Sequence, residues 1–361
     1  MSSPTVSVIM ATYNHAEFVK QAIQSVLSQK GVDFEFLISD DGSSDQTREV
    51  IASLIDDRIQ FFPNTINRGA CVVTNELIER ASGEFIALIN SDDYWLDVDK
   101  LSYQIKILRD SPSIGACFGR ARFVDEVGSN IDKDTLPFGN VFNQKNRSKG
   151  QWLRYFFDHG NCICHPTMLI RKSCYDELGG YDNRLRQLPD FDMWIRLIKK
   201  YDIFISDREL INFRIRPGEN ASSQTPTNSI RTINEHYLIA GSFFDGVTRS
   251  LFIDGFLDLL VVKDVPTVEH LDIEKALLFF IKNQWLEGPY RLTGLSNIYR
   301  FLNSSRHKPL LVSQYEIDDR WFQLKMGEIN TLMPNLITNV KEKVQKAKTG
   351  LRGFIGILFK K

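Results

Sequence analysis

The chain has 361 residues and a formal net charge of −1, with 43% apolar and 25% charged residues. This length predicts two structural units, and the composition is that of an ordinary globular protein. Such an even charge balance argues against a protein whose whole surface binds nucleic acid, so no nucleic-acid partner is expected. No stretch resembles a signal peptide, and no apolar run approaches the roughly 20 residues that cross a bilayer. The expected location is therefore the cytoplasm.

Strand and helix patterns alternate regularly through residues 1–110. Short apolar runs predict strands at residues 6–10, 34–38, 59–62 and 85–89. Apolar residues at helical spacing predict helices around residues 19–27, 50–54, 70–81 and 101–108. Asn14 and Glu17 match a capping box for the first helix, and Asp45 is placed to cap the second. With right-handed crossovers, this alternation predicts an α/β fold, a Rossmann-like, mostly parallel sheet flanked by helices.

The pattern loosens between residues 111 and 225. Strands are expected at residues 114–118 and 167–170, a polar loop region at 125–150, and helices at 173–178 and 190–200. Beyond residue 225, Leu, Phe and Ile recur at helical spacing, which predicts a mainly helical C-terminal region at 226–335. The predicted organisation is one domain, 1–225, with halves 1–110 and 111–225, followed by this helical region. The helical region is expected either to select the acceptor or to form a homo-oligomer.

The last segment, 336–361, is basic and amphipathic. From Thr338 onward it carries seven basic residues and a single acid, Glu342, with an apolar stripe along one face. This pattern is typical of a helix that lies on an anionic membrane surface. The alternative is a solvated helix that docks on its own domain. The first interpretation predicts a peripheral protein on the cytoplasmic face of a membrane.

Five scattered cysteines suit reduced thiols packed as small hydrophobic residues. Cys162, Cys164 and His165, with Cys174 nearby, raise the alternative of a zinc site. Structural zinc sites usually separate paired cysteines by two or more residues, so this spacing favours a plain strand instead.

Pairs of acids follow two of the predicted strands. Asp40-Asp41 comes after the second strand and Asp92-Asp93 after the fourth. Ligands bind at the carboxyl ends of strands in open α/β sheets, and adjacent acids there favour a divalent cation that also holds a diphosphate. The chain has no glycine-rich dinucleotide motif and no P-loop, so phosphate charge must be met by a metal or by arginine.

As an ordered set, the motifs of residues 4–220 resemble family 2 glycosyltransferases of the GT-A fold. The segments that carry the resemblance are Pro4–Asn14, Ser39–Thr47, Asn67–Gly69, Asn75, Ala81–Glu84, Asn90–Asp93, Gly179–Asp182 and Pro189–Arg196. The resemblance implies inverting transfer of a sugar, of hexosyl type, from a nucleotide-diphosphate donor, with UDP or dTDP favoured. The implied acceptor is a hydroxyl of a glycan or a lipid-linked glycan, as in polysaccharide biosynthesis.

The resemblance also implies roles for individual residues. Asp41 would contact the nucleobase, and Asp92 would contact the ribose. Asp92 and Asp93 together would hold a divalent metal (Mn²⁺ or Mg²⁺). Asp190 would be the general base. The other implied nucleotide contacts are Ala11, Tyr13 and Arg68, and the implied diphosphate or acceptor contacts are His165, Arg214 and Arg216.

Three residues depart from the family pattern: Asn90 stands where an acid is usual, Pro189 replaces a glutamate and Arg216 replaces a histidine. These departures keep open a catalytically silent homologue that binds nucleotide sugar. A metal-dependent nucleotidyltransferase is a further alternative, although the segment after the first strand lacks a basic, glycine-rich loop for a triphosphate. At single residues, Asp190 has the alternative of a helix cap, Arg68 of a solvated charge and His165 of a structural histidine.

Overall fold

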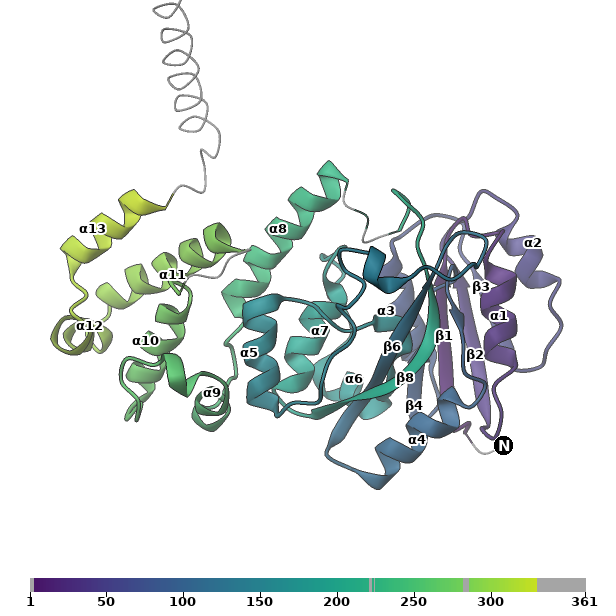
Figure 1. The fold of residues 1–361 in the computed structure, drawn as a ribbon, viewed down its shortest axis with the longest axis horizontal. Helices are drawn as coiled ribbons and strands as arrows, with labels where there is room; N and C mark the ends of the chain where they lie inside the picture. The colour runs from purple at the N-terminus through teal and green to yellow at the C-terminus, as the bar shows by residue number, and fades with distance from the viewer. Residues whose placement is uncertain (1–2, 221–222, 224, 282–285, 330–361) are drawn as a thin grey trace, which may run out of the picture. The chain divides into compact units, whose positions relative to one another are not determined.

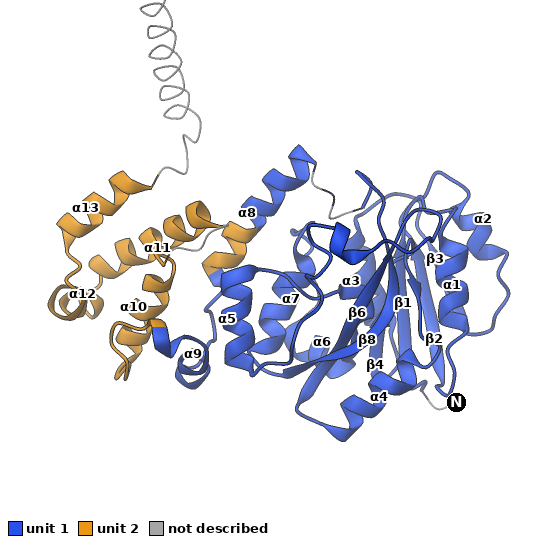
Figure 2. Ribbon diagram, viewed as in Figure 1, with its two compact units in different colours: residues 1–235, 242–258 blue, residues 236–241, 259–361 orange. Residues whose placement is uncertain are grey.

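The computed structural model describes residues 3–220, 223, 225–281 and 286–329. The chain separates into two compact units (Figure 2), the first formed by Met1–Glu235 with Ser242–Asp258, the second by His236–Gly241 with Leu259–Lys361. The predicted domain boundary near residue 225 falls just before helix α8 (Pro226–Ser242), which contributes residues to both units. The predicted basic tail, 336–361, lies outside the described residues.

The first unit is built on an eight-stranded sheet with the order β3-β2-β1-β4-β7-β6-β8-β5. The strands are β1 (Val6–Thr12), β2 (Phe34–Asp40), β3 (Ile59–Pro63), β4 (Phe85–Leu88), β5 (Tyr94–Trp95), β6 (Ile114–Val124), β7 (Leu169–Arg171) and β8 (Asp202–Arg214). Strands β3, β2, β1 and β4 are parallel, as are β6 and β8, whereas β7 is antiparallel to both its neighbours and β5 to β8. The prediction of a mostly parallel sheet flanked by helices is confirmed (Figure 1).

Helices pack along both sides of this sheet (Figure 1). Those of the first unit are α1 (Val19–Leu27), α2 (Thr47–Ala52), α3 (Ala70–Arg80), α4 (Lys100–Asp110), α5 (Lys149–His159), α6 (Lys172–Leu178), α7 (Pro189–Ile198), α9 (Arg249–Phe256) and the first part of α8. The apolar stripe of α1 packs against fully buried strand residues such as Val8 and Met10. Burial of that stripe, rather than helix propensity, stabilises so short a helix.

The capping box expected from Asn14 and Glu17 is wrong. Helix α1 begins at Val19 without a side-chain cap, and Asn14 lies in the left-handed region with φ 51°. Its Oδ1 accepts a hydrogen bond from the Ser44 N–H at 2.9 Å, so Asn14 ties the loop after β1 to the loop after β2. Asp45 behaves as predicted, because its carboxylate accepts the N–H of Thr47, the first residue of α2, at 3.0 Å.

The region after residue 110 differs most from expectation. Helix α5 and the long strand β8 were not predicted, since both carry many polar residues and β8 pairs with β6 through register shifts. Residues 162–164, predicted as a strand, lie in irregular structure before β7. All five cysteines are free, and four of them are buried. Among the described residues no group of three or more His, Cys, Asp or Glu side chains could hold a metal.

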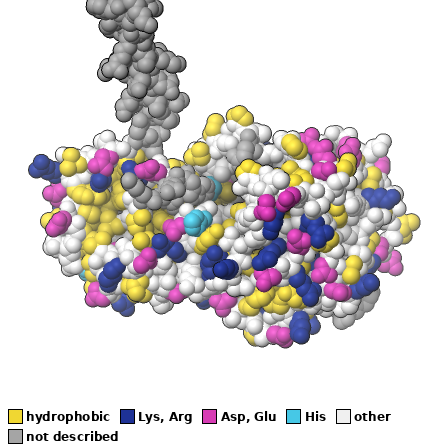
Figure 3. Space-filling view, in the orientation of Figure 1, with side chains coloured by type: hydrophobic (Ala, Val, Ile, Leu, Met, Phe, Trp, Pro, Cys, Tyr) yellow, Lys and Arg dark blue, Asp and Glu magenta, His cyan; other side chains and the backbone are white. Residues whose placement is uncertain are grey.

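The described part of the second unit is helical, as predicted for residues 226–335. It contains α10 (Val268–Leu278), α11 (Glu287–Leu302), α12 (His307–Tyr315) and α13 (Asp319–Glu328). Their apolar faces meet in a small core that includes Ile273, Ile298 and Leu311. None of the helices in the described part of the chain is long and apolar enough to cross a membrane. On the face drawn in Figure 3, acidic and basic side chains are interspersed over the first unit.

Candidate active site

The acid pair Asp92-Asp93 lies where β4 ends, beside the end of β8. Strand β5 starts directly after Asp93 and runs antiparallel to β8, so the chain at Tyr94 pairs with Asn212 and the end of β8 reaches the acids. The N–H of Arg214 donates to Asp93 Oδ1 at 2.8 Å, and Asn90 Nδ2 donates to Asp93 Oδ2 at 3.0 Å. Burial, together with the charge of Asp92, raises the pKa of Asp93 well above its usual range.

Arg214 is a buried support of this pair. Its Nε donates to the Asp92 carbonyl at 2.8 Å, and its two terminal nitrogens donate to Gln21 Oε1 at 2.7 Å and to the carbonyls of Asp125 and Glu126. Its guanidinium also lies 4.8 Å from the ring centre of Phe18. All three guanidinium nitrogens are thus bonded to protein oxygens.

Arg216 lies beside the same pair, with its Nη1 3.7 Å from Asp92 Oδ2, and its Nη2 pairs with Glu219. Nη1 also lies 2.9 Å from His15 Nε2, while His15 Nδ1 lies 2.7 Å from the hydroxyl of Ser91. Because a guanidinium only donates, His15 Nε2 must accept, and Nδ1 carries the proton that is donated to Ser91. Burial lowers the pKa of His15, which favours this neutral form.

The residues predicted to bind the nucleotide line the ends of β1, β2 and the loop after β3. Asp41 is buried, and its two carboxylate oxygens accept the N–H groups of Arg68 and Gly69 at 2.7 and 2.9 Å. The guanidinium of Arg68 pairs with Glu76 on α3 at 2.6 Å. Ala11 is half-buried, and the exposed Tyr13 follows β1.

Asp190 is the second residue of α7 and is half-buried. Its Oδ1 accepts the N–H of Phe191 at 2.8 Å, as a residue at a helix N-terminus can, and its Oδ2 accepts Asn161 Nδ2 at 2.7 Å. Burial raises the pKa of Asp190 to about 6, although both hydrogen bonds oppose the shift. Its helix neighbour Asp192 pairs instead with Arg196 at 2.9 Å.

The topology brings the two acidic centres to the same edge of the sheet. Since β7 is antiparallel to β4, the residues that precede β7 lie beside the end of β4. Those residues include Asn161, which bonds Asp190, and Cys164. Burial raises the pKa of Cys164, and the charges of both Asp93 and Asp190 raise it further. Cys164 therefore lies within electrostatic reach of both acids.

His165 is enclosed in an aromatic cluster next to these residues. Its Nε2 lies 2.8 Å from the hydroxyl of Tyr181, which lies 2.7 Å from that of Tyr175, and its ring lies edge-on to Trp194 at 5.4 Å. Burial lowers the pKa of His165 to about 4. At neutral pH this histidine is therefore uncharged.

Comparison with known proteins identifies the family. The family model for Glycosyl transferase family 2 matches residues 7–178. An uncharacterized glycosyltransferase of Methanocaldococcus jannaschii, MJ1057, is 32% identical over 229 residues, which cover 62% of this chain and 75% of that protein. The chain belongs to glycosyl transferase family 2.

Two other similarities extend further along the chain. The Escherichia coli protein WfgD, a UDP-Glc:alpha-D-GlcNAc-diphosphoundecaprenol beta-1,3-glucosyltransferase, is 25% identical over 252 residues, which cover 70% of this chain and 91% of that protein. The fold is also similar to the crystal structure of S. aureus TarS 1–349, with a TM-score of 0.53 and 16% identity. The match covers 90% of this chain and 91% of the TarS chain. At this identity the likeness to TarS establishes the fold alone.

The donor set at Asp92 and Asp93 fits a divalent cation in this family 2 glycosyltransferase. Mg²⁺ and Mn²⁺ prefer oxygen ligands, and Mg²⁺ is often held by one or two protein carboxylates together with substrate phosphates. The two adjacent carboxylates are donors of that kind, and in the described residues no third His, Cys, Asp or Glu is grouped with them. Asn90 takes no part as an acid but orients Asp93.

Three side chains of the site were not identified from the sequence: His15, Asn161 and Glu235. His15 follows β1 at the edge where ligands bind, and that position is the one signal that pointed to it. Asn161 lies in an irregular segment whose approach to Asp190 depends on the antiparallel β7. Glu235 belongs to α8, far outside the ordered motifs, and its partners become evident only in the structure.

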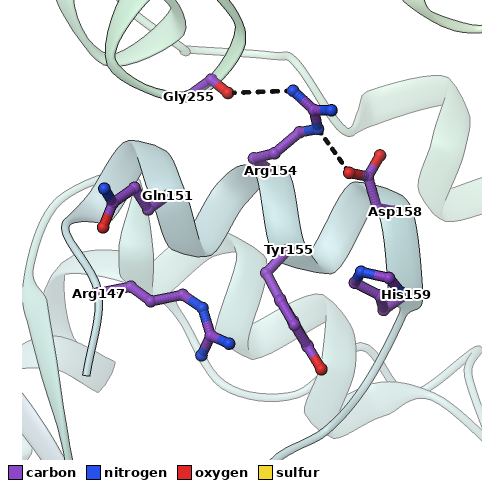
Figure 4. A pocket seen from close by; sticks show the side chains of 7 residues that line it. All are labelled: Arg147, Gln151, Arg154, Tyr155, Asp158, His159 and Gly255. Carbon is purple, nitrogen blue, oxygen red and sulfur yellow. Dashed lines mark hydrogen bonds and ion pairs between the residues drawn. The ribbon is translucent and has the colours of Figure 1, made fainter. Parts of the chain in front are cut away.

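A separate pocket of about 230 Å³ lies along α5 (Figure 4). It is lined by Arg147, Gln151, Arg154, Tyr155, Asp158, His159 and Gly255. Arg154 pairs with Asp158 at 2.5 Å, and the guanidinium of Arg147 lies 4.1 Å from the ring centre of Tyr155. No residue predicted from the sequence lies in this pocket.

Proposed function

We propose that this family 2 glycosyltransferase is an inverting enzyme that transfers a hexosyl group from a nucleotide-diphosphate donor to an acceptor hydroxyl, with Asp190 as general base. The observation that carries the proposal is the half-buried Asp190 carboxylate, which Asn161 ties to the segment beside the end of β4 and whose pKa is raised to about 6. A base whose pKa lies near the working pH combines the correct protonation state with useful basicity. The hydrogen bond from Asn161 to Oδ2 orients the carboxylate.

The donor would bind at the ends of β1, β2 and β4. Asp92 would contact the ribose and, with Asp93, hold a divalent cation, which as a Lewis acid stabilises charge on the diphosphate leaving group. Arg216 would meet phosphate charge, because its Nη1 lies 3.7 Å from Asp92 Oδ2 and its Nη2 pairs with Glu219, an exposed carboxylate that a phosphate would replace. In this proposal Arg214 supports Asp92 and Asp93 and does not contact the donor, because its three nitrogens are bonded to protein oxygens.

The nucleoside would lie over the loops after β1, β2 and β3. Asp41 holds the Arg68–Gly69 backbone and keeps free lone pairs for a base N–H, and Ala11 and Tyr13 border the same edge. Arg68 would contribute through its backbone position, since its guanidinium pairs with Glu76. His165 would shape the acceptor side as a neutral, buried ring.

The favoured donor is UDP-linked, with dTDP as the alternative, and the favoured acceptor is a glycan or a lipid-linked glycan. The name of WfgD, with a UDP-sugar donor and a diphosphoundecaprenol acceptor, supports this pairing. Binding to a membrane surface through residues 336–361 and self-association through residues 226–335 complete the proposal. The first of these segments lies outside the described residues, and most of the second belongs to the helical unit.

Two measurements test the proposal. Asp190→Asn should retain nucleotide binding and lower kcat by about 10²–10⁴-fold, whereas the control Asp192→Asn, on the same helix, should stay within about tenfold of the wild type. Calorimetric titration of UDP, dTDP and GDP with Mn²⁺, and again with EDTA, should show one nucleotide whose binding is lost with EDTA and in Asp93→Ala. An active Asp190→Asn variant would contradict the base assignment. Metal-independent binding of every nucleotide would contradict the metal role, and the absence of any nucleotide binding would contradict the donor site.

A further inference from the structure

Glu235 is a buried carboxylate in the first part of α8, beyond the residues that the family model matches. Its side chain is 4% exposed. Its Oε1 accepts the N–H of Arg186 at 2.9 Å, and its Oε2 accepts the N–H groups of Gln187 and Leu188, both at 2.8 Å. Three backbone donors thus converge on one carboxylate.

These three residues immediately precede α7, the helix that carries Asp190. Helix α7 begins at Pro189, which has no N–H, and Leu188 at its N-cap supplies no side-chain cap. Glu235 therefore accepts the backbone N–H groups of the turn at residues 186–188, as a capping side chain does at a helix N-terminus, although it belongs to a different helix, α8. Hydrogen bonds to an ionised acceptor are stronger than neutral ones, so the turn is firmly held.

We propose that Glu235 is a positioning residue that fixes the turn before α7 and thereby aims the Asp190 carboxylate at the acceptor. The inference rests on the proposed role of Asp190 as general base. Asp190 lies only two residues beyond Leu188, so a shift of the 186–188 backbone moves its Cα. Asn161 holds one carboxylate oxygen, but the helix N-terminus determines where the rest of the side chain lies.

The charge of Glu235 also affects Asp190, because it raises the pKa of the Asp190 carboxylate. Burial is the main cause of the raised pKa of Asp190, and Glu235 adds to it by like-charge repulsion. Burial raises the pKa values of two thiols, those of Cys71 on α3 and Cys164, and of the Tyr181 hydroxyl, and the charge of Asp190 raises each of them further. These three groups are therefore neutral at pH 7. Replacing Glu235 by Gln removes its contribution to the raised pKa of Asp190.

The second unit offers a matched control. Glu274 on α10 is also buried, and its carboxylate accepts the N–H groups of Val261 and Val262 at 3.0 and 2.7 Å. Glu274→Gln thus breaks the same kind of glutamate-to-backbone contact without touching the turn before α7. A loss of activity that reflected only a weakened loop somewhere in the protein would occur in both variants.

The experiment compares Glu235→Gln, Glu235→Asp, Glu274→Gln and Asp190→Asn in the full chain. We expect Glu235→Gln to lower kcat by about 10–100-fold, because small misplacement of a catalytic group has effects of that size. The Kd for UDP with Mn²⁺ should stay within twofold, and the acidic limb of the kcat/KM profile should move to lower pH. Glu274→Gln should leave kcat within about twofold. Glu235→Asp keeps the charge but shortens the side chain by one methylene, so its kcat should lie between that of Glu235→Gln and that of the wild type.

Hydrogen exchange separates this inference from the proposed function. The amides of Arg186, Gln187 and Leu188 should exchange faster in Glu235→Gln than in the wild type, whatever reaction the enzyme catalyses. If Asp190→Asn is active while those amides lose protection, the base assignment fails and the contact made by Glu235 stands. If protection and kcat are both unchanged in Glu235→Gln, or if Glu274→Gln loses as much activity, the positioning role is overturned.

Discussion

Two aspartates of the first unit show how the surroundings of a residue decide its chemistry. Burial alone would raise the pKa of Asp45, but hydrogen bonds from Thr47 and from the Ala16 N–H outweigh it and lower the pKa. At Asp190 burial prevails over two hydrogen bonds and raises the pKa to about 6. The first carboxylate is suited to hold a turn, and the second to exchange a proton near neutral pH.

The raised pKa of Asp190 predicts the pH dependence of the reaction. The proposed general base must be ionised, so kcat/KM should rise with pH and level off above about 6. The profile is measured at donor and acceptor concentrations below KM between pH 4.5 and 8.5, with enzyme stability checked at each pH. In Asp190→Asn the residual rate should lack this limb. A wild-type profile that is flat between pH 5 and 7 would argue for another base.

The same shift predicts that Asp190 lowers the stability of the folded protein at neutral pH. The folded pKa, about 6, lies above the usual value of 3.8, so the folded state binds the proton more tightly and loses stability as pH rises from about 4 to 6. Asparagine cannot ionise, so Asp190→Asn should be more stable than the wild type at pH 7.5, by about 1–3 kcal/mol. Urea unfolding at pH 7.5 and 4.5 measures this gain, which should shrink at the lower pH. Equal gains at both pH values would exclude the electrostatic cause.

At the scale of elements, α5 and α9 approach each other through two glycines. A Cβ on Gly255 would lie 2.4 Å from the carbonyl oxygen of Gly150, and a Cβ on Gly150 would lie 2.4 Å from Asp254 Oδ2. Asp254 in turn accepts hydrogen bonds from the Gly150 N–H at 3.0 Å and from the hydroxyl of Ser148, the N-cap of α5, at 2.6 Å. The packing of the two helices and the cap of α5 therefore depend on the same contact.

This close approach predicts that Gly255→Ala destabilises the first unit by about 1–3 kcal/mol, as overpacking usually does. Gly241 in α8 is the matched control, because a Cβ there meets nothing within 4 Å. Gly241→Ala should be neutral or stabilise the protein by at most about 1 kcal/mol, because glycine is unfavourable within a helix. Chemical denaturation of the two variants gives the comparison. Equal stability of both would mean that α5 and α9 separate at little cost.

The sequence was most informative where one element carries its own signal. The stripe of α1 and the apolar runs of β1 and β4 are periodic, and each was predicted to within a few residues. The acid pair was found because strand ends are predictable once the strands are. Strand β8 was missed because its central Ser206–Glu209 segment is polar, although pairing with β6 makes it a strand. Asn161 and Glu235 were missed because each acts on a residue distant in sequence, and such contacts leave no local pattern.

At the scale of the whole molecule, the proposed donor site is assembled from one unit only. The strand ends that carry Asp41 and Asp92, and helix α7 with Asp190, all belong to the first unit. The loops at these strand ends are held by backbone contacts to single carboxylates, such as those of Asp41 to Arg68 and Gly69. Ligand binding there should therefore change protection from hydrogen exchange within the first unit.

This placement predicts where a nucleotide stabilises the protein. A ligand at about 100 times its Kd adds about 2.7 kcal/mol to the stability of the state that binds it. With UDP and Mn²⁺ together, amides in the loops after β1, β2 and β4 should gain protection, and the thermal transition of the full chain should move to higher temperature. In the proposed site the diphosphate and the acid pair would share the cation, so Mn²⁺ alone or UDP with EDTA should have much smaller effects. Asp93→Ala is the control. In this variant UDP with Mn²⁺ should give no more amide protection and no higher transition temperature than UDP alone. Protection gained mainly in α10–α13 would instead assign nucleotide binding to the helical unit.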